Sequence, residues 1–136
     1  MSGNLLQKYA PAKPDESTGE EPVDSLDDLG AFAALRGIHD RALMLELRHK
    51  DGRRRALGYA WLHDVQFDPS NGITLYFGKT KVTIEGRNLN TEIRPGVRLF
   101  ECIIRHRVPW VQEADEAAAL LSSKEMVVIE TIEIES

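Results

Sequence analysis

The chain has 136 residues, of which 42% are hydrophobic and 29% are charged, and its net charge is −5 at pH 7. This length suits one domain with a real core, and no apolar stretch approaches the ~20 residues of a membrane-spanning helix, so the sequence predicts no such helix. Its single cysteine, Cys102, cannot form a disulfide within the chain, and the first residues do not resemble a secretory signal, which favours a reducing, cytoplasmic setting.

Charge is divided along the chain into three blocks. Residues 1–35 carry two basic and seven acidic side chains, residues 36–108 fourteen basic and eight acidic, and residues 109–136 one basic and seven acidic. Blocks of opposite sign can attract each other, or can mark a region that meets a polyanion. The basic middle block is therefore the first place to look for a binding surface.

The first segment, residues 1–24, is predicted to be a flexible acidic tail that precedes a single domain over residues 25–136. Three prolines interrupt any helix in this segment, and its acidic stretch shows no apolar period. Leu5, Leu6 and Tyr9 form a small apolar cluster ahead of the acidic residues. This cluster is either part of a frayed terminus or a short partner-binding motif.

A helix is predicted next, over about residues 25–36. Ser25 can cap its first turn, Asp28 suits the positive end of a helix dipole, and apolar residues recur at spacings of three and four. Gly37 is a natural helix stop.

The period then changes from 3.6 to 2, which predicts strands. The pair Asp51-Gly52 is a strong hairpin signal, and Gly78-Lys79 is a second tight-turn candidate. Four strands joined by short turns predict an antiparallel meander over about residues 42–86. Its buried face should include these large side chains: Leu45, Leu47, Trp61 and Leu75.

Two further elements are predicted beyond Gly86. A helical region covers about residues 96–121, with an interruption at Pro109, although alternation over residues 106–113 supports a strand there as a competing interpretation. Residues 126–135 form a strand whose acidic outer face suits a place beside the basic strands. The predicted fold class is therefore α+β: a four- to five-stranded antiparallel meander packed against two or three helices, with a small open barrel as the alternative.

Catalytic chemistry has no clear signature in this chain. None of the four histidines has the spacing to a Cys, His or acid that a zinc site requires, and there is no phosphate-binding loop, dinucleotide fingerprint or nucleophile motif. We therefore predict no catalytic residue, no metal ligand and no cofactor.

Basic residues at two predicted hairpin turns are the one chemical cluster that remains. Because alternate turns of a meander lie at the same end of the sheet, these side chains are expected to share one surface that could bind nucleic acid or another anion. They are Arg48, Lys50, Arg53, Arg54, Arg55, Lys79 and Lys81. Charged hairpin tips and charged sheet edges are also common without any ligand, because they prevent aggregation.

A partial resemblance points the same way. The stretch 45–53, with Gly58 and Asp64 after it, resembles the first motif of Sm-like small barrels, and the stretch 82–89 resembles their second motif. The resemblance implies a small barrel whose loops contact RNA. The sequence departs from the family at Asn71, which lies seven residues after Asp64 rather than a few.

Three functional hypotheses follow from these patterns. The first is a non-enzymatic cytoplasmic interaction or regulatory domain with a protein partner, because the charge blocks suit docking and no catalytic motif is present. The second is a nucleic-acid-binding small barrel that uses the basic hairpin tips. The third is an enzyme whose site is assembled from dispersed residues. No membrane partner is predicted, and the oligomeric state is left open.

Overall fold

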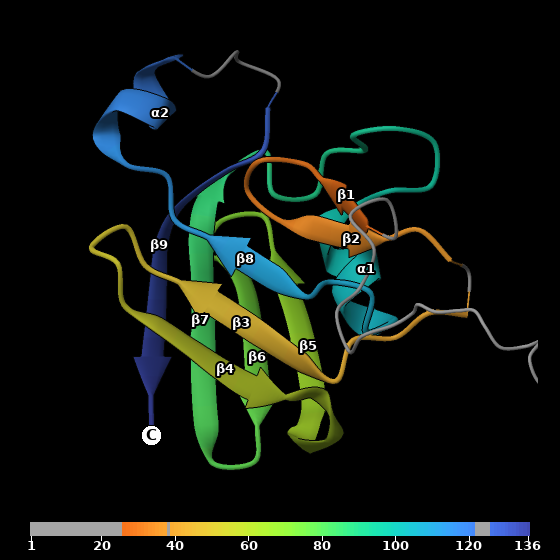
Figure 1. Ribbon diagram of the computed structural model, residues 1–136. Helices are drawn as coiled ribbons and strands as arrows, with labels where there is room; N and C mark the ends of the chain where they lie inside the picture. The colour runs from red at the N-terminus through yellow and green to blue at the C-terminus, as the bar shows by residue number, and fades with distance from the viewer. Residues whose placement is uncertain (1–25, 38, 122–125) are drawn as a thin grey trace, which may run out of the picture.

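The computed structural model describes residues 26–37, 39–121 and 126–136 (Figure 1). The predicted tail over residues 1–24 and the predicted helix cap Ser25 lie outside the described residues.

Strands dominate the described residues, and the two α-helices have six residues each. The strands are β1 (Leu26–Asp28), β2 (Ala33–Leu35), β3 (Met44–Arg48), β4 (Arg54–Gly58), β5 (Leu62–Asp68), β6 (Gly72–Phe77), β7 (Thr80–Arg87), β8 (Trp110–Gln112) and β9 (Val128–Glu135). The helices are α1 (Leu99–Ile104), α2 (Glu116–Leu121) and the 3-10 turn η3 (Tyr59–Trp61). The predicted α+β fold with two or three packed helices is therefore wrong, because the chain is rich in sheet. Both α-helices of the described part are too short to cross a bilayer.

Three sheets form instead of one meander. The largest has the strand order β5-β6-β7-β9 and is antiparallel throughout. The second has the order β4-β3-β8, with β8 parallel to β3, and the third is the hairpin β1-β2. Figure 1 shows β3 and β4 crossing over the four-stranded sheet, so that the two larger sheets face each other.

The core lies between these two sheets. Leu45 and Leu47 of β3 and Leu75 of β6 are fully buried, as their alternation predicts, together with Val82 and Ile84 of β7. Burial of each such side chain is worth about 1.5–3 kcal/mol relative to exposure, so this interface dominates the stability of the fold.

The predicted continuous meander breaks between β4 and β5. These strands belong to different sheets because η3 intervenes, and the Tyr59 side chain turns into the core, where its hydroxyl donates to the Val108 carbonyl at 2.7 Å. Trp61, which the alternation places in the core, is 70% exposed. The prediction is right for the three leucines and wrong for the tryptophan.

The predicted helix over residues 25–36 is a hairpin. Asp28 accepts a hydrogen bond from the Gly30 backbone N–H at 3.0 Å, and Gly30 has a φ of +89°, so the residues between the strands form a turn. Residues 32–35 are all buried, a pattern typical of a strand covered on both faces rather than of a helical stripe.

The predicted helical region over residues 96–121 is right only for α1 and α2 and wrong for the residues between them. Helix α1 ends early because His106 takes a left-handed φ of +59° and the Arg107 N–H donates to the Cys102 carbonyl at 2.8 Å, which closes the helix end. The competing interpretation of residues 106–113 as a strand is right for residues 110–112, which form β8, and α2 is the one helix described beyond it.

The C-terminal strand is confirmed and extends the larger sheet. Strand β9 pairs with β7, and this register sets Lys81 opposite Glu135. The register shifts at Gly86, where a Cβ atom would lie 1.9 Å from the Val128 carbonyl oxygen, so only glycine permits this close pairing.

Candidate functional site

The seven predicted basic residues do not share one surface. The β3-β4 turn and the β6-β7 turn belong to different sheets and lie on different sides of the molecule (Figure 1). The hairpin tip with Arg53, Arg54 and Arg55 is thus separated from Lys79, because the expected meander is not formed.

Acidic neighbours compensate much of the charge at the β3-β4 hairpin. Glu46 pairs with the Nε atoms of Arg48 at 2.7 Å and Arg54 at 3.1 Å, and Asp51 pairs with the Nε of Arg53 at 2.8 Å. A hydrogen bond from the Arg53 backbone N–H, together with the charge of its guanidinium, holds the pKa of Asp51 below its ordinary value. These arginines therefore already have partners within the chain.

The same hairpin faces the acidic end of β9. A groove of about 1030 Å³ is lined on one side by Arg53, Arg54 and Arg55 and on the other by Glu133 and Glu135. The basic block thus meets an acidic block of the same chain rather than a second basic turn.

The outer face of the four-stranded sheet is acidic. It is the face opposite the buried leucine, valine and isoleucine side chains, and its exposed acidic residues are Asp64, Asp68, Glu85, Glu133 and Glu135. The basic residues of β7 on that face are Lys81 and, at the end of the strand, Arg87, which pairs with Glu130 at 3.5 Å. Such a surface repels the phosphates of a nucleic acid.

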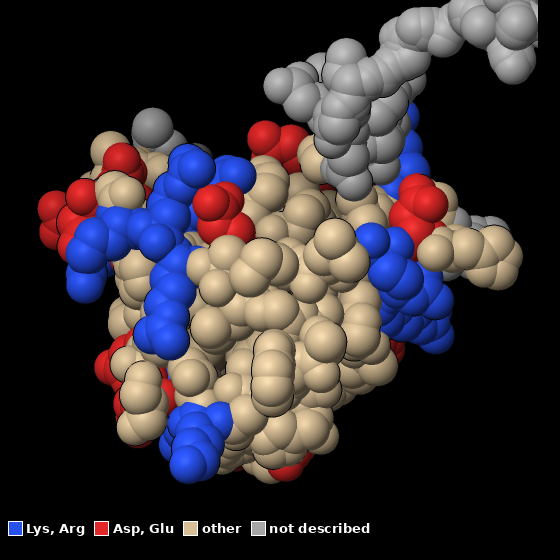
Figure 2. All heavy atoms as spheres, turned by 60° about the horizontal axis from the view of Figure 1, so that its bottom comes forward, with Lys and Arg blue, Asp and Glu red and all other residues tan. Residues whose placement is uncertain are grey.

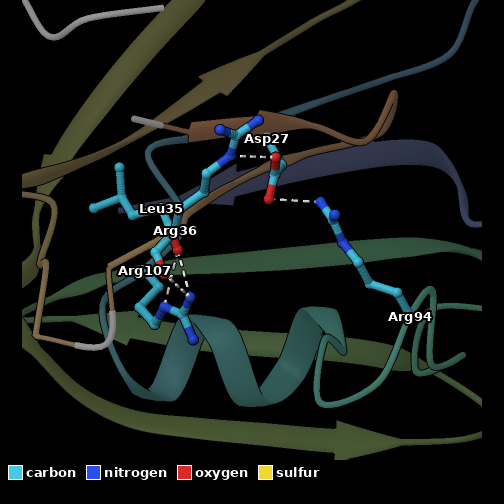
Figure 3. Close-up of polar contacts among 5 residues, drawn as sticks. All are labelled: Asp27, Leu35, Arg36, Arg94 and Arg107. Carbon is cyan, nitrogen blue, oxygen red and sulfur yellow. Dashed lines mark hydrogen bonds and ion pairs between the residues drawn. The ribbon is translucent and has the colours of Figure 1, made fainter. Parts of the chain in front are cut away.

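A second group of arginines stabilises the β1-β2 hairpin (Figure 3). The Asp27 carboxylate of β1 forms two ion pairs, one through each oxygen. Its Oδ1 lies 2.7 Å from the Nε of Arg36, and its Oδ2 lies 2.6 Å from an Nη of Arg94. The Arg107 guanidinium donates to the Leu35 carbonyl, with an Nε distance of 3.1 Å. These contacts connect segments that are distant in sequence, so they give these arginines a structural role.

A cavity of about 550 Å³ near α2 is lined by Glu113 and His49, which are distant in the sequence and which the sequence patterns did not predict to be neighbours. Glu113 and His49 approach to 3.5 Å between carboxylate and Nδ1, and the Glu113 side chain is only 7% exposed. Its two oxygens accept the backbone N–H groups of Lys50 at 2.9 Å and Ile132 at 2.7 Å. Glu113 therefore connects the β3-β4 hairpin to β9, and this structural role accounts for its burial.

Another reactive group, the Cys102 thiol, lies buried in the core. Burial raises the pKa of the Cys102 thiol, which makes its nucleophilic thiolate scarce at neutral pH. Among the described residues, no three His, Cys, Asp or Glu side chains are grouped as metal ligands.

The exposed apolar side chains give a different kind of site. Leu43 is 88% exposed, Met44 48% and Trp61 70%. Their backbones lie close together at one end of the β3-β4 hairpin, because the Leu43 carbonyl accepts the Tyr59 N–H at 3.0 Å and Met44 is opposite Gly58 in the β3-β4 register. We call Leu43, Met44 and Trp61 the apolar end.

Two glycines lie next to the Trp61 ring. A Cβ atom on Gly58 would lie 3.4 Å from its Cδ1, and one on Gly78 would lie 3.8 Å from its Cε3. The Gly78 N–H also donates to the Trp61 carbonyl at 2.9 Å. The indole thus rests between the end of β4 and the β6-β7 turn, and most of its surface is open to solvent.

Basic groups flank the apolar end. Arg41 precedes Leu43 by two residues, and Lys79 follows Gly78 in the β6-β7 turn; both are exposed. Figure 2, which brings the lower end of Figure 1 forward, shows a broad uncharged face with basic side chains on both flanks and acidic side chains beside them. Burial, together with the nearby charge of Arg41, lowers the pKa of His106, whose ring stacks on Tyr59 at 4.5 Å.

The sequence contained a signal for this surface that the alternation concealed. Gly58, Ala60 and Gly78 are small residues around Trp61, and small residues allow another group to lie on the backbone. Here that group is the Trp61 ring, because the strand alternation is interrupted at η3 and Trp61 is exposed there. No protein-family model, curated protein or solved structure matches the chain.

Proposed function

We propose that this chain is a non-enzymatic interaction domain that binds a protein segment through the apolar end. The observation that carries the proposal is the exposure of Leu43, Met44 and Trp61 on neighbouring backbone segments at this end of the β3-β4 hairpin. Large apolar side chains exposed together and bordered by polar groups mark interaction surfaces in soluble proteins. A cytoplasmic location is part of the proposal, because a lone unoxidised thiol suits a reducing compartment.

Trp61 is the natural anchor of such an interface. Tryptophan is enriched among the residues that carry most of the binding free energy, and its truncation there costs about 2 kcal/mol or more. Its ring lies next to the backbone at Gly58 and Gly78 and leaves most of its surface open to a partner.

The flanking charges indicate the chemistry of the partner. Arg41 and Lys79 favour carboxylates beside the apolar contact, so the segment should combine a large apolar side chain with Asp or Glu. A basic segment would be repelled by the same groups.

The nucleic-acid alternative has less support. The arginines of the β3-β4 hairpin have acidic partners at Glu46 and Asp51, and the open sheet face is acidic, so phosphates would compete with carboxylates already in place. The aromatic ring of Trp61 could stack on a base, so binding of short RNA and DNA is measured alongside peptide binding.

The test is a selection from a displayed library of random peptides against the full chain. We expect enriched peptides to carry a large apolar residue next to Asp or Glu. Their affinity should fall about 30-fold or more in Trp61→Ala, since ~2 kcal/mol corresponds to that factor. Leu120→Ala, which removes an exposed leucine of α2, is the matched control and should leave binding unchanged.

Two outcomes contradict the proposal. One is peptide binding that is equal in the wild type, Trp61→Ala and Leu120→Ala. The other is salt-sensitive binding of short RNA or DNA at low ionic strength, measured by fluorescence anisotropy, in the absence of any Trp61-dependent peptide; that result would favour the nucleic-acid alternative.

A further inference from the structure

The chain itself contains a segment with the chemistry that the apolar end should bind. Leu5, Leu6 and Tyr9 are large apolar residues, and they precede a stretch with five carboxylates, Asp15, Glu16, Glu20, Glu21 and Asp24. The described residues begin only after this segment, at Leu26 of β1.

The tether between the two is long enough. Tyr9 and Leu26 are seventeen residue steps apart, which allows up to roughly 56 Å at ~3.3 Å per step and a root-mean-square span of about 23 Å for a flexible chain. A domain of about 110 residues has a radius of gyration near 13 Å, so such a tether reaches any part of its surface. A tethered segment competes at an effective concentration in the millimolar range.

Charge also favours this occupant over a second copy of the sheet. The preceding segment carries five acidic and two basic side chains, whereas Arg41 and Lys79 flank the apolar end. Pairing of β9 or β4 with its own copy would bring Glu133 and Glu135, or Arg54 and Arg55, toward like charges.

We propose that residues 5–24 of the same chain dock on the apolar end, with Leu5, Leu6 and Tyr9 against Trp61, and thereby compete with an external partner. This inference rests on the proposed function, because it uses the same surface. An external segment then binds only when it displaces the chain's own segment.

The test uses the full chain labelled with 5-fluorotryptophan. The chain has two tryptophans, so ¹⁹F spectra contain two resonances, assigned with Trp61→Phe and Trp110→Phe. We expect the variant Leu5→Ser/Leu6→Ser/Tyr9→Ser to shift the Trp61 resonance and to increase its solvent isotope shift between H₂O and D₂O at least twofold. The Trp110 resonance serves as an internal reference and should not move.

A control variant and a titration separate the alternatives. Asn4→Ser/Gln7→Ser/Ala10→Ser changes the same number of positions without removing a large apolar side chain, and it should match the wild type. Selected acidic peptides should bind the apolar-to-serine variant at least threefold more tightly than the wild type.

Two results overturn this inference. Identical Trp61 resonances in the wild type and the apolar-to-serine variant would show that the segment does not dock there. A difference that disappears on dilution would assign the contact to a second molecule. If either result occurs while selected peptides still require Trp61, the proposed function stands and only the internal occupant is wrong; loss of the Trp61 requirement contradicts both.

Discussion

Trp61 and Trp110 look alike in the sequence but have opposite roles in the structure. Trp110 of β8 is 9% exposed, and the Arg48 guanidinium covers its ring at 4.3 Å from the centroid. Trp61 is 70% exposed, and it rests on two glycines instead of on a side-chain core. One tryptophan is therefore part of the core, whereas the other is open to solvent.

The largest expected effect tests that difference directly. Trp110→Ala should lower the free energy of unfolding by about 3 kcal/mol, because it removes a buried aromatic ring and its cation–π contact. Trp61→Ala should change it by less than about 0.5 kcal/mol, as for an exposed residue. Urea unfolding followed by circular dichroism measures both, and equal losses for the two variants would contradict the assignment of roles.

A smaller effect is expected where the two larger sheets are connected. Glu113→Gln should cost about 2 kcal/mol, because an amide has one acceptor oxygen where the carboxylate serves two backbone N–H groups, at Lys50 and Ile132. The same unfolding measurement applies, with Glu133→Gln, an exposed position on β9, as the matched control. A loss of stability no greater than that of the control would contradict the structural role assigned to Glu113.

The smallest effect concerns pH near the apolar end. Burial lowers the pKa of His106, so the native state disfavours its charged form. The stability contributed by neutral His106 is present above its ordinary pKa of 6.5. It is lost as the pH falls through that value toward the lower pKa that His106 has in the native state. Because the ring is only partly buried, the effect should be small.

The matched variant for this prediction is His106→Asn. Asparagine tolerates the left-handed φ of +59° and does not titrate, so the other histidines and carboxylates contribute equally to both proteins. We expect the urea midpoint of the wild type to fall more between pH 7.5 and 5 than that of His106→Asn. Parallel pH profiles would contradict the role assigned to His106.

The local pairing of strands was predictable from the sequence, but the sheets in which they lie were not. Alternation and the Asp51-Gly52 turn correctly predict the β3-β4 hairpin, and the alternating C-terminal residues correctly predict β9. The parallel pair β3-β8 joins residues more than sixty positions apart, and periodicity contains no information on such a pairing. Arg53 and Lys79 do not share a surface because η3 places β4 and β5 in different sheets.

The helix predictions failed where local signals had another explanation. Asp28 resembled a helix-dipole acid but accepts a turn hydrogen bond, and His106 ends α1 in a conformation usually taken by glycine. The candidate site was missed because alternation placed Trp61 in the core. Its exposure depends on η3, which turns Tyr59 inward in its place.

The most direct measurement is a titration of the 5-fluorotryptophan-labelled full chain with a selected acidic, apolar peptide. If the apolar end is the docking surface, the Trp61 resonance shifts in a saturable way while the Trp110 resonance stays fixed. A shift of Trp110 alone, or saturable peptide binding with no change at Trp61, would contradict the account.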